Sequence, residues 1–425
     1  MASYGLSHRA AWADGQPISR LMAQALANPQ LISLAAGFVD QQTLPTGPTE
    51  QAFAALWEEP AAARAALQYG TTPGYEPLRE MLLEQLELPL GCPSPSIEQV
   101  VVTAGSNQLL HLVCESLLDP GDIVICAAPT YLVFLGTLSN LGARSIGVAT
   151  DDQGIIPESL ESLLADLQRR GELERVKAIY LVPYFDNPQG VTMPLERRAA
   201  VVESAARWSK RHAIHVIEDA AYRLLRYEGE DVPSTWTVDE THERVIVAGT
   251  FSKTFAPGIR VGWGILPAHL VDPVCQQKGN IDFGSPNFGQ HLMAKVMELG
   301  LFEPHVAFIR AEYEKKRQCM LAAIERELAP IDGVRWVRPE GGLYVWVELP
   351  ESLPAGPGTP LEQAAIDEGV LYVPGQYCFP EGGEPTRAHT MRLSFGVPTC
   401  ENIERGIAAL AHAIRRTMDG LSRTG

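Results

Sequence analysis

The chain has 425 residues, of which 46% are hydrophobic and 20% charged, and its formal net charge is −17. This composition is typical of a folded globular protein and argues against intrinsic disorder. The acidic balance argues against a nucleic-acid partner, because a phosphate backbone needs a basic face, although a local cluster of Lys and Arg could still hold a small anion. The length exceeds what one hydrophobic core usually serves, so we expect one large domain and one smaller domain.

The cysteines and the hydrophobic runs predict the cellular compartment of the protein. No two cysteines have C-x-x-C spacing and their number is odd, which predicts buried free thiols in a reducing environment. The first residues contain no apolar signal core, and no apolar run reaches the length of a membrane span. We therefore expect a cytoplasmic protein with no membrane partner. The cysteines are Cys92, Cys114, Cys126, Cys275, Cys319, Cys378 and Cys400.

Short apolar runs alternate with amphipathic stretches from about residue 97 to 266. The clearest helices between them are expected at 106–118 and 194–211, the second entered through Met193-Pro194. Continuous Val/Ile runs separated by helices predict an α/β fold with a mostly parallel, seven-stranded sheet covered on both faces. The seven expected strands lie at 97–105, 122–129, 143–150, 176–184, 213–219, 244–250 and 260–267.

The rest of the chain predicts a smaller α+β domain. Residues 288–327 indicate long helices, a meander of strand-like runs follows, and 401–418 is a last apolar helical stretch. We expect a large domain at 46–290 and a small domain formed by 1–45 with 291–425.

Polar residues follow the expected strands, at the edge where open α/β sheets bind ligands. The residues at these strand ends are Gly105, Ser106, Asn107, Tyr131, Asn187, Asp219, Tyr222, Ser252, Lys253 and Arg260. A helix N-terminus at 105–107, with Ser252 and Arg260, suits a phosphate. Tyr131 suits stacking on a heteroaromatic ring, and Asp219 suits a protonated ring nitrogen.

The remaining groups complete one ligand. Tyr222 and Asn187 could hold a phenolate oxygen, and the amine of Lys253 could capture an aldehyde as a Schiff base. Phosphate, pyridine, phenolate and aldehyde together describe pyridoxal 5′-phosphate, whose ring acts as an electron sink.

Each residue alone has a plainer interpretation. Lys253 could be a solvated loop charge, Asp219 a helix cap, and Asn187 part of an ordinary turn. Tyr131 and Tyr222 could be residues at the rim of the core. The order of these residue types at successive strand ends favours the cofactor site.

Several motifs resemble the class I/II aminotransferases, which are enzymes of fold type I that use pyridoxal phosphate. These motifs are SKTFAPGIRVGW, DNPQG, EDAAY, YGTTPGYEPLRE, RPEGGLYVW and MRLSFG. The resemblance covers about 30–415 and implies an aspartate-aminotransferase-like fold. The segment ISLAAGFVDQQTLP is similar to the branch with 2-aminoadipate and kynurenine aminotransferases, although Ala36 stands where that branch usually has a second glycine.

The resemblance assigns roles to matching positions. It implies that Lys253 is the Schiff-base lysine and proton shuttle, and that Arg392 grips the substrate α-carboxylate. Gly37 would let the N-terminal segment close over the substrate. Tyr69 would reach the phosphate of a neighbouring subunit, which implies a homodimer with shared active sites.

Three further residues are weaker candidates on the same resemblance. Ser285 and Asn287 could border the partner's phosphate site. Arg20 could contact a substrate side chain, although we expect that it does not.

The implied activity is transfer of an amino group between an L-amino acid and a 2-oxo acid, with ping-pong kinetics. An alternative is a lyase or a β/γ-elimination enzyme on the same scaffold. A sensor that binds the cofactor without catalysis is a second alternative. A dinucleotide-dependent dehydrogenase is disfavoured, because no G-x-G-x-x-G follows a strand.

Overall fold

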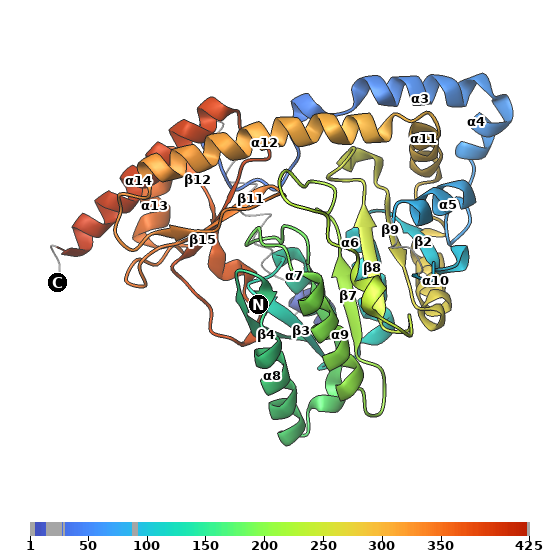
Figure 1. Ribbon diagram of the computed structural model, residues 1–425, viewed down its shortest axis with the longest axis horizontal. Coiled ribbons are helices and arrows are strands. Elements are labelled where there is room, and N and C mark those ends of the chain that lie inside the picture. The colour runs from blue at the N-terminus through green and yellow to red at the C-terminus, as the bar shows by residue number, and fades with distance from the viewer. Residues whose placement is uncertain (1–4, 14–27, 29, 87–91, 423–425) are drawn as a thin grey trace.

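A central sheet organises the larger part of the computed structural model, which describes residues 5–13, 28, 30–86 and 92–422 (Figure 1). Its strands are β2 (Val100–Thr103), β3 (Ile123–Ala128), β4 (Arg144–Asp151), β5 (Gly154–Ile155), β6 (Val176–Leu181), β7 (His215–Asp219), β8 (Val245–Thr250), β9 (Gly262–Ile265) and β14 (Gly382–Gly383). They lie in the order β14-β4-β3-β6-β7-β8-β9-β2, and β5 pairs with β4.

The sheet is mostly parallel, as the sequence predicts. Strands β4, β3, β6, β7 and β8 run parallel to one another, whereas β9 is antiparallel to both of its neighbours, β8 and β2. The seven predicted strands correspond to β2, β3, β4, β6, β7, β8 and β9. Strands β5 and β14 are two-residue additions that the apolar pattern does not reveal, because they are too short to show a period.

Both faces of the sheet are buried because successive side chains of each strand point to opposite sides. In β3, Ile123 and Ile125 pack into one core cluster, and Val124 and Cys126 pack into another. The first cluster draws on helices α5 (Glu76–Glu84), α8 (Pro157–Arg169), α9 (Leu195–Trp208) and α11 (Asn287–Glu298). The second draws on α6 (Ser106–Leu117), α7 (Leu132–Asn140) and α10 (Ala268–Asp282).

The two helices predicted most clearly are present with small boundary differences. The predicted helix 106–118 is α6, and 194–211 is α9, whose N-cap is Pro194. Helix α9 ends three residues earlier than predicted. The Ser209 hydroxyl there donates to the carbonyl of Ala205, which also accepts the Ser209 N–H, and it accepts the N–H of Ile214 in the segment after the helix.

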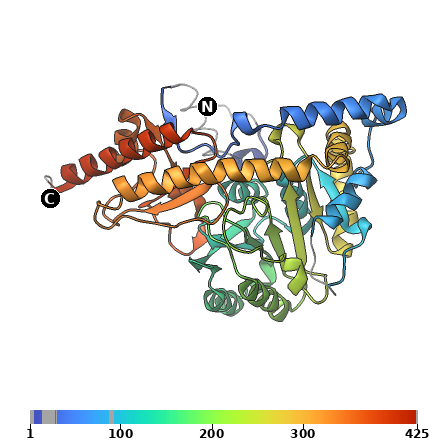
Figure 2. The ribbon, with the colours of Figure 1, turned by 45° about the horizontal axis from the view of Figure 1, so that its top comes forward.

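A second core lies beside the sheet and is built from the C-terminal part of the chain. An antiparallel sheet is ordered β10-β11-β15-β13, and β1 pairs with β12 in parallel. Helix α12 extends across both parts in Figures 1 and 2. The elements are α12 (Phe302–Glu327), α13 (Pro360–Asp367), α14 (Cys400–Ser422), β1 (Ile32–Ser33), β10 (Arg335–Trp336), β11 (Tyr344–Glu348), β12 (Val370–Leu371), β13 (Val373–Pro374) and β15 (Thr390–Ser394).

Helix α12 joins the two cores. Phe302 and Val306 at its start belong to the core of the main sheet, and residues from Ile309 onward belong to the second core. The domain division at residues 45 and 290 stays a proposal, and α12, which follows residue 290, contributes side chains to both cores.

The N-terminal segment contacts both parts. Ile32 of β1 pairs with Val370, whereas Trp12 of α1 (His8–Trp12) accepts a hydrogen bond from Ser139 of α7 through its carbonyl. Two further helices, α3 (Thr46–Glu58) and α4 (Pro60–Ala66), follow before α5 and pack against α11.

The cysteines correct one expectation. Cys319 in α12 and Cys400 at the start of α14 form a disulfide, so the prediction that all cysteines are free is wrong. The sequence could not reveal this pair, because 81 positions separate two residues that the packing of α12 on α14 brings together.

A further prediction concerns membranes. Among the described residues, no helix is both long and apolar enough to cross one.

Candidate active site

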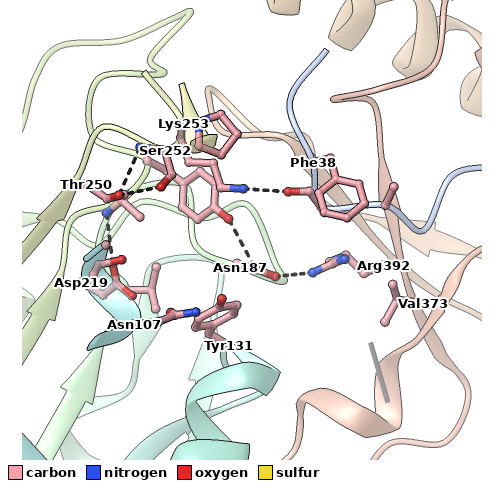
Figure 3. A pocket seen from close by; sticks show the side chains of 18 of the residues that line it. Phe38, Asn107, Tyr131, Asn187, Asp219, Thr250, Ser252, Lys253, Val373 and Arg392 are labelled. Carbon is pink, nitrogen blue, oxygen red and sulfur yellow. Dashed lines mark hydrogen bonds between the residues drawn. The ribbon is translucent and has the colours of Figure 1, made fainter. Parts of the chain in front are cut away.

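A cavity of about 480 Å³ lies at the carboxyl ends of the parallel strands, between the main sheet and the N-terminal and C-terminal segments (Figure 3). It is lined by Ser33, Ala35, Ala36, Gly37, Phe38, Gly105, Ser106, Asn107, Tyr131, Val182, Asn187, Asp219, Ala221, Tyr222, Thr250, Ser252, Lys253, Pro257, Arg260, Val373 and Arg392. The fold therefore gathers side chains from segments as distant in the sequence as Ala35 and Arg392, which are 357 positions apart.

Lys253 enters this cavity from the loop after β8. Its Nζ donates to the carbonyl oxygen of Gly37 at 2.7 Å, and no carboxylate of the described residues forms an ion pair with it. The loop is held locally, because the Thr250 hydroxyl donates to Ser252 Oγ and accepts the Ser252 N–H. Lys253 is thus an ammonium held at a cavity wall by a neutral acceptor, which leaves it available to a ligand.

The N-terminus of α6 and Arg260 form a site suited to an anion. Helix α6 has no side-chain cap, and its N-cap Gly105 has φ 96°, a conformation that favours glycine. A Cβ at Gly105 would lie 2.5 Å from Arg260 Nη2, so only glycine lets the guanidinium approach the helix end. Arg260 donates to the carbonyls of Pro257 and Ala104, and no described carboxylate pairs with it. Free helix N–H groups beside an unpaired guanidinium fit a phosphate.

Asp219 ends β7 and is buried in the cavity wall. One carboxylate oxygen accepts the hydroxyl of Tyr180 at 2.8 Å, and the other accepts the backbone N–H of Ala221 at 3.2 Å. Burial raises the pKa of Asp219 to about 6, partly opposed by the hydrogen bond from Tyr180. A buried carboxylate that is costly to ionise fits a ligand that carries a proton or positive charge.

Asn187, Tyr222 and Tyr344 form a chain of hydrogen bonds, and the first two of them line the cavity. Asn187 Nδ2 donates to the Tyr222 hydroxyl at 3.4 Å, and the hydroxyls of Tyr222 and Tyr344 lie 3.1 Å apart. Gly37 is needed opposite this chain, because a Cβ there would lie 3.0 Å from the Tyr344 hydroxyl. The arrangement offers both donors and acceptors to a ring oxygen.

Arg392 is a buried cation without a carboxylate partner among the described residues. The residue is 2% exposed, and it donates from Nη1 to Asn187 Oδ1 and from Nη2 to the carbonyl of Ala35. Its Nε has no hydrogen-bond partner, and its guanidinium lies 4.2 Å from the ring centre of Tyr344. An unpaired buried charge is destabilising, so this geometry fits a ligand that brings its own carboxylate.

Most of the residues predicted for the site line this cavity. The strand-end residues, Gly37 and Arg392 all do, whereas Tyr69 does not. Tyr69 is 77% exposed, and its ring packs edge-on against Phe283.

Two of the weaker candidates, Ser285 and Asn287, do not line the cavity either. Ser285 is buried and donates to the carbonyl of Val102, and Asn287 donates to the carbonyls of Ala65 and Gln68 next to Tyr69. Arg20 lies outside the described residues.

Sequence reasoning missed several lining residues. Thr250 immediately precedes the lysine loop and Phe38 immediately follows Gly37, so adjacency could have suggested both. Val373, Val182 and Ser33 carry no signal in the sequence, because apolar and small residues of this kind are common in any core.

Comparisons with known proteins identify the family of this chain. Residues 29–410 match the family model for aminotransferase class I and II. The chain is 36% identical over 388 residues to aromatic-amino-acid aminotransferase 1 of Thermococcus litoralis, and the match covers 91% of this chain and 89% of that protein.

Two solved structures are also similar. Kynurenine aminotransferase of Pyrococcus horikoshii, in complex with PMP, has a TM-score of 0.88 at 34% identity and covers 97% of both chains. The α-aminoadipate aminotransferase of Thermus thermophilus, complexed with N-(5′-phosphopyridoxyl)-L-leucine, has a TM-score of 0.84 at 29% identity, covering 98% of this chain and all of that one. The chain therefore belongs to the class I and II aminotransferase family and is a transaminase.

Proposed function

We propose that this transaminase binds pyridoxal 5′-phosphate in the cavity and exchanges an amino group between an L-amino acid and a 2-oxo acid. One observation carries the proposal: the buried Arg392, with no described carboxylate partner, faces the same cavity as Lys253 and Asp219. An α-carboxylate, an amine-reactive group and a protonated ring nitrogen would each find a complementary side chain there.

The residues around the cavity would hold the parts of the cofactor separately. The N-terminus of α6, Ser252 and Arg260 would bind the phosphate. Tyr131, the N-cap residue of α7, lines the cavity. Its aromatic side chain would stack on the ring of the cofactor.

The remaining contacts would be hydrogen bonds to the polar atoms at the edge of the cofactor ring. Asp219 would pair with the ring nitrogen, and Asn187 and Tyr222 would donate to the ring oxygen. The complexes of the two similar structures with PMP and with a phosphopyridoxyl compound support a cofactor of this kind in this chain.

When bound, the cofactor supplies an aldehyde for covalent capture of the amine and a ring that withdraws electrons. Lys253 Nζ would take the proton from the α-carbon of the amino acid as a general base. In the reverse half-reaction it would deliver a proton to the α-carbon of the 2-oxo acid as a general acid. Arg392 would orient the α-carboxylate by two parallel hydrogen bonds, which fixes the α-carbon relative to Lys253. Because the first product must leave before the second substrate binds, ping-pong kinetics are expected.

We further propose a substrate with an apolar or aromatic side chain. Phe38 and Val373 line the cavity, and Phe38 is 52% exposed in this state, so both offer apolar contact. The cations among the described lining residues are Lys253, Arg260 and Arg392, and each has a role already. The name of the Thermococcus litoralis relative supports the same preference.

A homodimer with shared sites is also proposed. Tyr69 is far more exposed than a phosphate ligand of its own chain would be. It lies among other exposed apolar side chains, including Leu67, Ile281 and Phe283. A patch of this kind marks a protein interface more often than free surface. Asn287 fixes the loop of Tyr69 through the carbonyls of Ala65 and Gln68, so the loop is already shaped.

Visible absorbance of the purified protein, followed during addition of single amino acids, tests the proposal. We expect a yellow protein that loses its colour with an aromatic donor and releases the matching 2-oxo acid in equal amount. Release of ammonia in place of that exchange would favour the lyase or elimination alternative. A protein that takes up no added pyridoxal phosphate would overturn the cofactor assignment.

A further inference from the structure

We propose that Tyr180 is a positioning residue of this site, because its hydroxyl holds the Asp219 carboxylate in one orientation and so controls how that carboxylate meets the ring nitrogen. This inference rests on the role proposed for Asp219 above. Tyr180 itself does not line the cavity, so it acts through Asp219 and touches neither substrate nor cofactor.

The hydrogen bond has one possible direction. A carboxylate only accepts, so the Tyr180 hydroxyl donates to Asp219 Oδ2 over 2.8 Å. The Ala221 N–H donates to Oδ1 over 3.2 Å. Two donors on different oxygens prevent rotation of the carboxylate about its last bond. Each oxygen keeps a further lone pair, so the group can still accept a proton-bearing nitrogen from the cavity.

Tyr180 is itself held rigidly. It has no exposed surface and lies on β6 opposite Ile217 of β7, two residues before Asp219. Its ring stacks on Phe134 of α7 with centroids 3.8 Å apart and an angle of 21°. Phe134 lies three residues after Tyr131, so α7 supports both the ring proposed to stack on the cofactor and the tyrosine behind Asp219. A rigid donor holds the carboxylate in one orientation better than a mobile donor, because little side-chain rotamer entropy is lost when the hydrogen bond forms.

Tyr180 also affects the charge of Asp219. Burial raises the pKa of this carboxyl, and the hydrogen bond from Tyr180 lowers it. The other groups that influence Asp219 are Glu218 beside it and Lys253 across the cavity, and Asp219 in turn influences Tyr131. Glu218 points away from the cavity, since it accepts from the Ser234 hydroxyl and the Thr235 N–H. Loss of the Tyr180 hydroxyl should therefore make Asp219 harder to ionise near neutral pH.

The test compares Tyr180→Phe with a matched control. Tyr184→Phe removes another buried hydroxyl from the same segment, one with no hydrogen-bond partner among the described residues, and it keeps its ring beneath Arg198. Both variants keep an aromatic ring, and circular dichroism and melting curves would establish that both fold.

Two readouts separate a positioning role from a structural one. The first is the affinity of the apoprotein for pyridoxal phosphate, measured by absorbance titration. The second is the pH profile of kcat/KM. For Tyr180→Phe we expect roughly tenfold weaker cofactor binding, the loss typical of a hydrogen bond to a charged group. We also expect the acidic limb of the profile to move up by about one pH unit. Tyr184→Phe should change neither.

A double-mutant cycle with Asp219→Asn provides a second measurement. If Tyr180 acts through Asp219, then adding Tyr180→Phe to Asp219→Asn should cause little further loss of cofactor affinity. Unchanged affinity and an unchanged acidic limb in a folded Tyr180→Phe protein would overturn the inference. Additive losses in the cycle would do so too. Failure of the proposed function is a different result, because the wild-type protein would then take up no cofactor at all.

Discussion

The Nζ of Lys253 lies 2.7 Å from the carbonyl oxygen of Gly37, so the proposed reactive amine is hydrogen-bonded to the N-terminal segment. Arg392 reaches the same segment, donating to the carbonyl of Ala35 at 3.0 Å. Both cations thus rest on neutral backbone acceptors two residues apart. Neutral acceptors are weaker partners than carboxylates, so an incoming ligand can replace them at moderate cost.

Replacement of Lys253 by Ala should abolish transamination. The variant loses the amine that we propose captures the aldehyde and moves the α-proton, and a catalytic proton-transfer group alone contributes roughly 10²–10⁴-fold. Single-turnover measurements with an amino acid would detect any residual exchange. Lys210→Ala, which changes a lysine outside the cavity, serves as the control, and a fully active Lys253→Ala protein would refute the assignment.

Arg392→Lys should weaken binding of every amino acid and 2-oxo acid alike. A lysine cannot form two parallel hydrogen bonds with a carboxylate, and it loses the contacts with Asn187 and Ala35. We expect KM to rise roughly 10- to 100-fold for both substrates, as loss of charge-assisted hydrogen bonds predicts. Steady-state kinetics measure this, with the α14 variant Arg415→Lys as the control. An effect limited to one side-chain class would contradict an α-carboxylate role.

Asp219→Asn should stabilise the cofactor-free protein at neutral pH. Burial raises the folded-state pKa of Asp219 to about 6, above its value in the unfolded chain. Its ionised form therefore destabilises the fold, and this cost grows as the pH rises through about 4 to 6 and is then constant. Removing it should raise the free energy of unfolding at pH 7.5 by on the order of 1–3 kcal/mol.

Urea unfolding of both apoproteins at pH 7.5 and pH 4 would measure the change, and the difference should disappear at the lower pH. Asp186, whose pKa burial raises to about 7, is present in both proteins and cancels in the comparison. A variant that is less stable than the wild type at pH 7.5 would contradict the prediction.

Mixed dimers can test whether Tyr69 serves the partner's site. Lys253→Ala and Tyr69→Phe subunits should each have low activity alone. In a mixed dimer, one site combines both changes and the other combines neither, provided that Tyr69 acts across the interface. Random mixing of equal amounts should then make about a quarter of all sites intact, because about half of the dimers are mixed and one of the two sites in each mixed dimer carries neither change. No recovery, in a sample that mass spectrometry shows to be mixed, would place Tyr69 outside the partner's site.

Cys319→Ser should lower stability without removing activity. The disulfide joins two residues 81 positions apart, in α12 and α14, away from the cavity. We expect loss of about 2–4 kcal/mol of unfolding free energy, because the unfolded chain gains freedom. Thermal melts of the variant and of the wild type, each with and without reductant, would measure this. Reductant should shift only the wild type, and an equal shift in both would point to another cause.

The order of the secondary-structure elements and the residue types at the strand ends can be predicted from the sequence alone. The alternating apolar runs and helices report local burial, and parallel strands necessarily end at one edge. Asn187, Asp219, Lys253 and Arg260 could therefore be predicted to meet. The Arg392 assignment came from a family motif, since a single arginine in a strand is compatible with an ordinary ion pair.

Contacts between side chains that are distant in the sequence depend on the packing of the folded chain. In the folded chain Cys319 forms a disulfide with Cys400, and the Tyr180 hydroxyl donates a hydrogen bond to Asp219. Tyr69 is exposed and does not line the cavity of its own chain. Folding also adds Phe38 and Val373 to the cavity wall. Sequence periodicity shows that a side chain is buried but not what it is buried against, because that depends on how separate elements pack.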